Sequence, residues 1–341
     1  MALSWDRAIL GVAWHSTWHR IGESNGASHY LVQNGNPGHQ RSGTNADALW
    51  HDESMTTEST EAASGEEIAA TSAETRAEMT RLAARGYTQL RHVLVQLPDA
   101  KKPRASTAAR ALSARKHRAL LLYILLLTCW PWLKKRTYPL EADVWVRALE
   151  SKTGHTWSTS TLSRAWADLV EMGLVTKERE GRLVRVTPRR EDGAAEYAEP
   201  GGRTDRWNTY FVLPDEFWNE EWFAKLSMPA LVMFLVIAKE TNNKDEVWLN
   251  YDRADEWYGI KAKSAQNGLT ELVALGLAHR RTERIKAKLS PTGETVRMWY
   301  SLTGVFGHTS RAALQTRAKK ATRKRHAAAS KKVSGGGSAA P

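Results

Sequence analysis

The 341-residue sequence has few of the features that mark secreted, membrane-spanning or thiol-dependent proteins. It contains one cysteine, Cys129, so no intrachain disulfide or thiolate metal cluster can form, which is typical of a reducing cytosol. The apolar run 119–133 contains a proline and has positive charge at both ends, whereas a membrane-spanning helix needs about 20 apolar residues. The first residues do not show the pattern of a secretory signal, which is a positively charged segment followed by a long apolar one. We therefore expect a cytoplasmic protein without a membrane partner.

Motifs of nucleotide hydrolysis and metal chemistry are also missing. No G-x-x-x-x-G-K-[ST] segment is present to hold phosphates, which argues against a P-loop ATPase. The sequence also has no pair of histidines separated by one apolar residue, which argues against a rolling-circle nickase. His15 and His19 have helical spacing, but no H-E-x-x-H pattern accompanies them. We expect no metal, no cofactor and no enzymatic activity.

The net charge of +12 is concentrated in two segments. Residues 81–118 carry ten basic groups and one acidic group, and residues 311–341 carry nine basic groups and no acidic one. Residues 51–80 have the opposite bias, with eight acidic groups and one basic group. Basic segments that flank a folded core are suited to bind nucleic-acid phosphates regardless of sequence, and solvated tails that aid solubility are the alternative.

One stretch of the chain occurs twice in degenerate form. Residues 162–176 read LSRAWADLVEMGLVT, and residues 265–279 read AQNGLTELVALGLAH. In both copies the core positions recur at i, i+3, i+4, i+7 and i+8, which predicts one apolar stripe on a helix. Gly173 and Gly276 follow at the positions where helices end, because glycine adopts the left-handed conformation without strain. A spacing of 103 residues separates the two copies, and this self-similarity predicts a duplicated unit.

Each copy has the same predicted elements before and after the repeated helix. The apolar runs Leu120–Leu127 and Leu231–Ala238 predict buried first helices, and 141–150 and 253–258 predict second helices plugged by Trp145 and Trp257. A hairpin is predicted after each glycine, turning at Glu180-Gly181 in the first copy and at 290–293 in the second.

Three helices followed by a hairpin resemble a winged helix-turn-helix module, and the chain contains the pattern twice. YFVLPDEFW (210–218) and KLSMPALVMFLVI (225–237) make the second copy similar to the first winged-helix domain of plasmid-type and primosomal replication initiators. The resemblance implies a mainly α protein with small β-hairpins (α+β). We name residues 116–192 the first module and residues 208–304 the second module. The remaining segments are predicted as a low-complexity, disordered N-terminal region (1–80), a basic connector (81–115), a linker (193–207) and a basic disordered tail (305–341).

A helix in the DNA major groove buries one side and presents polar side chains on the other. In the first module small hydroxyls allow a close approach to phosphate, and Arg164 can pair with guanine. In the second module Gln266 and Asn267 have the amide geometry that pairs with adenine, although acidic neighbours oppose phosphate binding. Basic hairpin residues are expected to reach the backbone or the minor groove. The predicted DNA-binding residues are Ser158, Thr159, Ser160, Thr161, Ser163, Arg164, Lys177, Arg179, Arg182, Arg185, Lys263, Ser264, Gln266, Asn267, Arg280 and Arg281.

Three functions stay open at this point. The first is a transcriptional regulator of a bacterial genome or mobile element, associated with the nucleoid, with double-stranded DNA as its partner. The second is a replication initiator that binds plasmid-type repeats, which the resemblance of the second module favours. The third is a non-enzymatic protein-interaction scaffold, which the acidic second module favours. A homodimer or proteins of replication or transcription are further expected partners.

Overall fold

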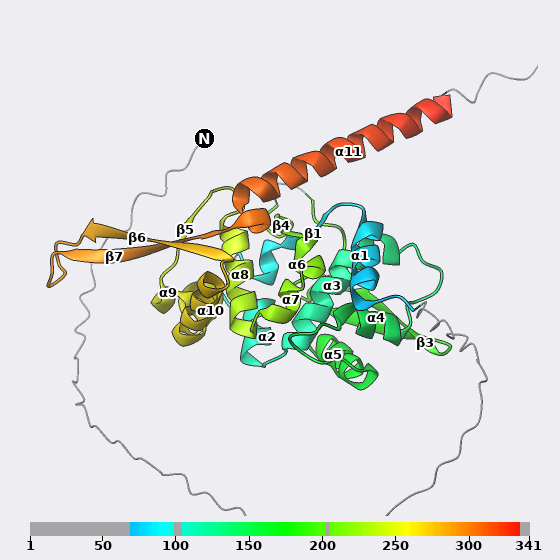
Figure 1. Cartoon of the computed structure of the whole chain (residues 1–341), viewed down its shortest axis with the longest axis horizontal. Coiled ribbons are helices and arrows are strands. Elements are labelled where there is room, and N and C mark those ends of the chain that lie inside the picture. Colours follow the sequence, from blue (N-terminus) through cyan, green and yellow to red (C-terminus); the bar gives the residue numbers. More distant parts are fainter. Residues whose placement is uncertain (1–68, 99–103, 202–204, 335–341) are drawn as a thin grey trace, which may run out of the picture. The chain divides into compact units, whose positions relative to one another are not determined.

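The computed structural model describes residues 69–98, 104–201 and 205–334, with side chains as far as residue 325. His15, His19 and most of the predicted N-terminal region lie outside these residues. The described residues have mixed α and β structure and belong to one compact unit that begins at Ala69 (Figure 1). In chain order, the elements up to the end of the first module's hairpin are α1 (Ser72–Ala83), β1 (Tyr87–Arg91), η1 (His92–Leu94), α2 (Thr107–Ser113), α3 (His117–Leu133), α4 (Ala142–Leu149), α5 (Thr159–Glu171), β2 (Val175–Glu180) and β3 (Leu183–Pro188). They are followed by β4 (Tyr210–Pro214), α6 (Glu216–Asn219), α7 (Trp222–Lys225), α8 (Met228–Glu240), β5 (Val247–Trp248), α9 (Tyr251–Tyr258), α10 (Ala262–Ala274), β6 (Ala278–Lys286), β7 (Glu294–Leu302), η2 (Gly304–Phe306) and α11 (His308–Ser334).

The duplicated stretch forms equivalent helices. Helices α5 and α10 each have 13 residues, and both their first and their last residues are 103 positions apart. Ser158 caps α5 in a capping box with Thr161, whereas α10 has no side-chain cap. The fifth predicted stripe position is not buried, since Val170 is exposed and Val273 is half-buried. The other four positions are confirmed, since each helix buries four residues at the expected spacing. These are Leu162, Ala165, Trp166 and Leu169 in α5, and Ala265, Gly268, Leu269 and Leu272 in α10.

Both helices end as the glycines predict. Gly173 and Gly276 have φ of +72° and +70°. Leu174 N donates to Leu169 O at 2.9 Å, and Leu277 N donates to Leu272 O at 3.0 Å. These are the six-to-one hydrogen bonds of a Schellman motif, which turn the chain from the helix into the first hairpin strand.

Both predicted hairpins are present, with small differences in their turns. Strands β2 and β3 pair as far as Glu180 opposite Leu183, so the turn is Gly181-Arg182 rather than Glu180-Gly181. Strands β6 and β7 pair from Ala278–Leu302 to Lys286–Glu294. The short strand β5 extends this second sheet in the order β5-β7-β6, while the sheet of the first module has two strands.

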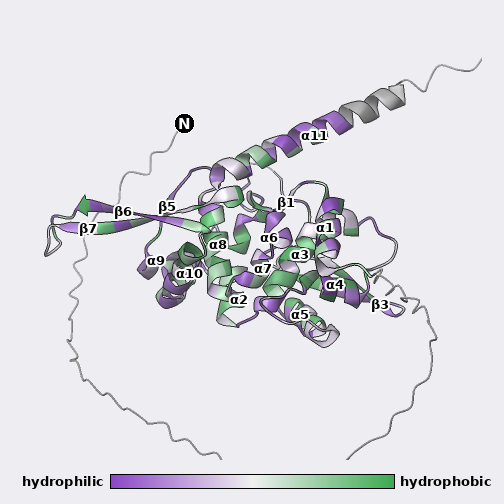
Figure 2. Cartoon of the chain, in the orientation of Figure 1, coloured by the Kyte–Doolittle hydropathy of each residue, from purple (hydrophilic) through white to green (hydrophobic). Residues whose placement is uncertain are grey.

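The first helices of the modules form the centre of the core. Helix α3 is buried from Ala119 to Cys129, and α8 is buried from Ala230 to Ala238, as predicted. Figure 2 shows hydrophobic colours on both helices. Burying a leucine or isoleucine side chain contributes about 1.5–3 kcal/mol, so these two runs supply much of the driving force for folding. Within the described ranges, none of the helices combines the length and the apolarity that crossing a membrane requires.

The second helices differ in how they close the core. In α4, Trp145 is buried and meets Trp166 of α5 edge to face, with ring centroids 5.5 Å apart. In α9 the prediction that Trp257 fills the core is wrong, because Ala254 and Tyr258 face inward at a spacing of four residues. Trp257 is half-buried at the side of this helix and meets the ring of Trp248 at 6.1 Å.

A sheet of two strands joins segments that are far apart in the sequence. Strand β1 pairs antiparallel with β4, with Tyr87 opposite Pro214 and Arg91 opposite Tyr210. The Arg91 guanidinium is buried with the Glu191 carboxylate, with Nη1 and Oε2 2.8 Å apart. Removing either partner would leave a buried charge without compensation, so this pair fixes the end of the first module to β1, which in turn pairs with β4 of the second module.

Two predicted boundaries on the N-terminal side change. Residue 80 lies inside α1, which is capped by Thr71 and buries Met79 and Arg76, so 72–80 are not disordered. The predicted basic connector 81–115 contains the end of α1, then β1, η1 and α2. Composition hid these elements because α1 has few apolar side chains, and three of its five buried residues, Thr75, Arg76 and Thr80, are polar or charged.

The linker and the tail also differ from the prediction. Pro200 is buried, and the Tyr197 ring lies 5.2 Å from the Arg91 guanidinium, so this part of the linker packs on the core. The predicted tail without regular structure is helical as α11 from His308 to Ser334. Alanine, lysine and arginine are strong helix formers, which explains the helix in a segment of low complexity.

Candidate nucleic-acid interface

The exposed side of α5 carries the residues that the sequence predicted for the first module. Thr159, Ser163 and Arg164 are exposed. Ser158 and Thr161 are occupied in capping, since Thr161 N donates to Ser158 Oγ at 3.2 Å and Ser158 N donates to Thr161 Oγ1 at 2.7 Å. The hydroxyls of Ser158 and Thr161 therefore organise the first turn. Ser160 is exposed, and its Oγ lies 3.0 Å from Ser158 Oγ.

A basic cleft lies where α5 meets the start of α3. Its volume is about 200 Å³, and Arg164 and Thr161 are part of its lining. Lys116 is partly neutralised, because its Nζ donates to Asp168 Oδ1 at 2.5 Å and lies 3.5 Å from Glu171. Within the described ranges, Arg164 has no carboxylate within ion-pair distance. The cleft is lined by Arg115, Lys116, His117, Arg118, His155, Thr161, Arg164, Ala165 and Asp168.

Two histidines in the cleft support its wall without adding charge. His155 Nε2 and His117 Nδ1 are 2.8 Å apart, and the rings meet edge to face. Burial lowers the pKa of His117 to about 4, with smaller contributions from His155 and Arg118. Burial and Arg118 also lower the pKa of His155. At neutral pH the pair is therefore uncharged, and it braces the loop before α5 against α3.

The hairpin of the first module has cations of two kinds. Lys177, Arg179 and Arg182 are exposed, and none of them has an ion-pair partner among the residues described here. Lys177 and Arg179 project from the same face of β2, as the alternation predicted. Arg185 is different, because it pairs with Glu180 at 2.8 Å and donates to the carbonyl of Thr137. Arg185 therefore holds the hairpin against the segment after α3.

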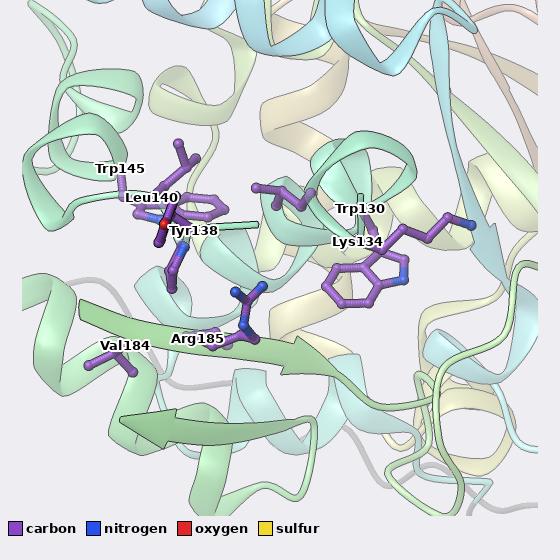
Figure 3. A pocket seen from close by; sticks show the side chains of 10 residues that line it. Trp130, Lys134, Tyr138, Leu140, Trp145, Val184 and Arg185 are labelled. Carbon is purple, nitrogen blue, oxygen red and sulfur yellow. The ribbon is translucent and has the colours of Figure 1, made fainter. Parts of the chain in front are cut away.

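An apolar hollow lies behind this hairpin. It encloses about 190 Å³ between the end of α3, α4 and β3, with Trp130, Tyr138 and Val184 in its wall (Figure 3). Figure 3 also shows Arg185 and Lys134 at the hollow. Both cations have anionic partners, since Lys134 Nζ lies 2.5 Å from Glu199 Oε1. Because both cations are paired with carboxylates, neither is available in the hollow to bind an anionic ligand.

The second module presents polar side chains with less available charge. On α10, Lys263, Gln266 and Asn267 are exposed, while Ser264 is half-buried. Arg280 is exposed on β6. Arg281 is engaged, because its Nη2 lies 2.7 Å from Glu246 and its guanidinium stacks over Trp299 at 5.4 Å. Exposed acidic groups surround this module, namely Asp245, Asp252 and Asp255.

Sequence reasoning missed several of the cations that the fold collects. Arg115, Lys116 and Arg118 were predicted only as part of the basic segment 81–118, without a place beside α5, yet they line the cleft beside Arg164. The three cations of the segment 115–118 were the available signal, but only the fold brings them to α5. Among the described residues, no group of three or more potential ligands is placed to hold a metal ion. A second set of exposed cations lies on α11, at Arg317, Lys319, Lys320, Arg323, Lys324 and Arg325.

Comparison with known proteins adds no assignment. The chain matches no family model, and searches of curated proteins and of solved structures each gave no match.

Proposed function

We propose that the chain binds specific double-stranded DNA through two winged-helix modules and has no enzymatic activity. One observation carries this proposal: the exposed side of α5, the basic cleft and the hairpin cations occur together in the first module. A major groove accepts one α-helix, and arginine reads guanine through two parallel hydrogen bonds. In this proposal Arg164 contacts a base, while Arg115 and Arg118 contact phosphates beside the groove.

The second module has a supporting role in the proposed DNA binding. Its helices α8, α9 and α10 and the sheet β5-β7-β6 follow the element order of a winged helix. Its hairpin cations are partly paired, through Arg281 with Glu246 and Arg284 with Glu294. Gln266 and Asn267 are free to contact adenine, so the second module adds sequence preference more than phosphate affinity.

Regulation of transcription in a bacterial genome or mobile element is the role we propose first, with a nucleoid location. Replication initiation is the second candidate, favoured by the resemblance of residues 210–218 and 225–237 to plasmid-type initiators. In the structure those residues form β4, α6 and α8, which are buried parts of the shared core. Because they are buried, they support the fold resemblance, and the arrangement of binding sites must decide between the two roles.

The test is selection of bound duplexes from a random library, followed by footprinting on genomic fragments. We expect one enriched motif, whose enrichment falls when Arg164→Ala replaces the wild type. Arg81→Ala is the matched control, because Arg81 is exposed on α1 and paired with Glu78. A single footprint over a promoter supports regulation, and iterated footprints support initiation. Binding to a protein partner without affinity for any duplex would overturn the proposal in favour of a scaffold.

A further inference from the structure

Helix α11 carries a dense set of cations without compensating charge. Six of the nine residues from 317 to 325 are lysine or arginine, all six are exposed, and residues 311–341 contain no acidic residue. Several of these cations are three or four positions apart, as are Arg317 and Lys320, or Lys320 and Lys324. Like charges at this spacing oppose helix formation. An anionic partner would reduce the repulsion between these cations and would therefore stabilise the helix.

The start of α11 is fixed firmly to the core. Arg311 is buried, and its guanidinium donates to the carbonyls of Phe306 and Ala238, each at 2.8 Å, and to Thr241 Oγ1 at 2.7 Å. His308 Nδ1 lies 2.9 Å from Thr241 O. This attachment at the C-terminal end of α8 sets the direction in which the rest of the helix continues.

Between residues 316 and 325, the last whose side chains the structure describes, α11 has no apolar side to place against a protein groove or a lipid surface. After half-buried Leu314 and Gln315, the described side chains are polar or alanine, and Figure 2 shows hydrophilic colours over the middle of the helix. A helix that docks in an apolar groove or lies on a membrane needs an apolar stripe. Charge complementarity leaves a polyanion as the partner.

We propose that residues 317–325 of α11 form an arm that binds the phosphate backbone of duplex DNA. At 1.5 Å per residue the arm is about 13 Å long, and a duplex carries about one charge per 1.7 Å, or about eight phosphates over that length. The six positive charges of the arm are thus comparable in number to the negative charges of a duplex over the same length. The inference rests on the proposed function, and it assigns the arm affinity without sequence preference, because phosphate contacts carry no sequence information.

The magnitude follows from counterion release. About three to four of the six cations can face one duplex at a time, because the others lie on the opposite side of the helix. Each neutralised phosphate contributes about 0.9 to the slope of log affinity against log salt, so the arm supplies about three units. Between 50 and 200 mM salt, affinity would then fall about 60-fold less in a protein without these charges.

The experiment compares the full chain with a variant in which all six cations are glutamine. Glutamine keeps a high helix propensity, and Arg311 is untouched, so the anchor remains. The control carries three substitutions of exposed cations on other elements, namely Arg81→Gln, Lys225→Gln and Lys244→Gln. Binding to a random duplex is measured over a salt series, and the ratio of affinities for the selected and the random duplex is measured at one salt concentration.

The expected result is a slope reduced by about three units in the six-glutamine variant, less than one unit in the control, and an unchanged affinity ratio. If the salt slope of the six-glutamine variant is unchanged while the chain still binds DNA, the proposal that α11 binds phosphates is overturned and the proposed function stands. A reduced slope in a chain without sequence preference supports the arm and contradicts the proposed function. Absence of duplex binding by the wild type, or equal binding of poly-glutamate, overturns the assignment of a duplex to α11.

Discussion

Gly268 is the residue at which the packing of the second module can be tested most sharply. It lies within α10 on the buried side, against the first turn of α8. A Cβ atom at this position would lie 2.4 Å from Pro229 O and 2.7 Å from Pro229 C. The equivalent residue of α5 is Ala165, which is buried and carries a Cβ, so the repeat itself does not require glycine.

The sign of the effect of Gly268→Ala depends on this contact. In an unconstrained helix interior the substitution stabilises by about 1 kcal/mol, because alanine has the higher helix propensity. Here the new methyl group meets backbone atoms, which no rotamer change can remove, so α8 and α10 must separate by about 1 Å. Overpacking of this kind costs about 1–3 kcal/mol and more when backbone must move. We expect a net loss of about 1–2 kcal/mol in the free energy of unfolding.

Urea unfolding followed by circular dichroism measures this quantity. Gln266→Ala is the matched control, because Gln266 is exposed on the same helix, and its change should stay within about 0.5 kcal/mol. The reasoning is refuted if Gly268→Ala raises stability by about 1 kcal/mol, since that is the response of a helix whose inner side has free space.

Three further predictions address the DNA surface and the core. Arg164→Ala should weaken binding to the selected duplex by about 1–3 kcal/mol and relax preference at one or two bases, measured on a panel of single-base variants; equal loss on random DNA would show a backbone contact. Lys177→Ala with Arg182→Ala should lower affinity on all duplexes and reduce the salt slope by about one to two units, and an unchanged slope would exclude the hairpin from the interface. Arg185 is left out of this pair because it holds the hairpin in place. Burial, and secondarily Glu216, raises the pKa of Asp215 to about 7, so stability is lost as pH rises from the unfolded value of about 3.9 through 7. Asp215→Asn should therefore stabilise the protein by about 1–3 kcal/mol at pH 8 and by less at pH 5, measured by urea unfolding of the variant and the wild type at each pH. The same difference between variant and wild type at both pH values would contradict the burial argument.

The parts of the fold that the sequence predicted are those with local, periodic signals. Helices α5 and α10 could be placed from their apolar stripes, and their ends from Gly173 and Gly276, because a Schellman motif depends on the conformation of one residue. The hairpins followed from the β-prone runs after each glycine. The exposure of Arg164 follows from the same periodicity.

The parts that the sequence did not predict depend on contacts between distant residues. The β1–β4 sheet and the Arg91–Glu191 pair join positions about 100 or more residues apart, and no periodic pattern marks either of them. The cleft depends on residues 115–118 meeting α5, which is a consequence of helix packing. The anchor of α11 is one buried arginine, Arg311, in a segment whose composition indicated only a basic tail.

Site-specific crosslinking tests the central claim most directly, namely that α5 enters a DNA groove. A photoreactive residue is introduced at Ser163, which is exposed on α5, and at Asn219, which is exposed at the end of α6, as the control. On the selected duplex we predict crosslinks from position 163 to bases within the footprint and none from position 219. Crosslinks from neither position, or equal crosslinks from both, would contradict the claim that α5 is the helix that reads DNA.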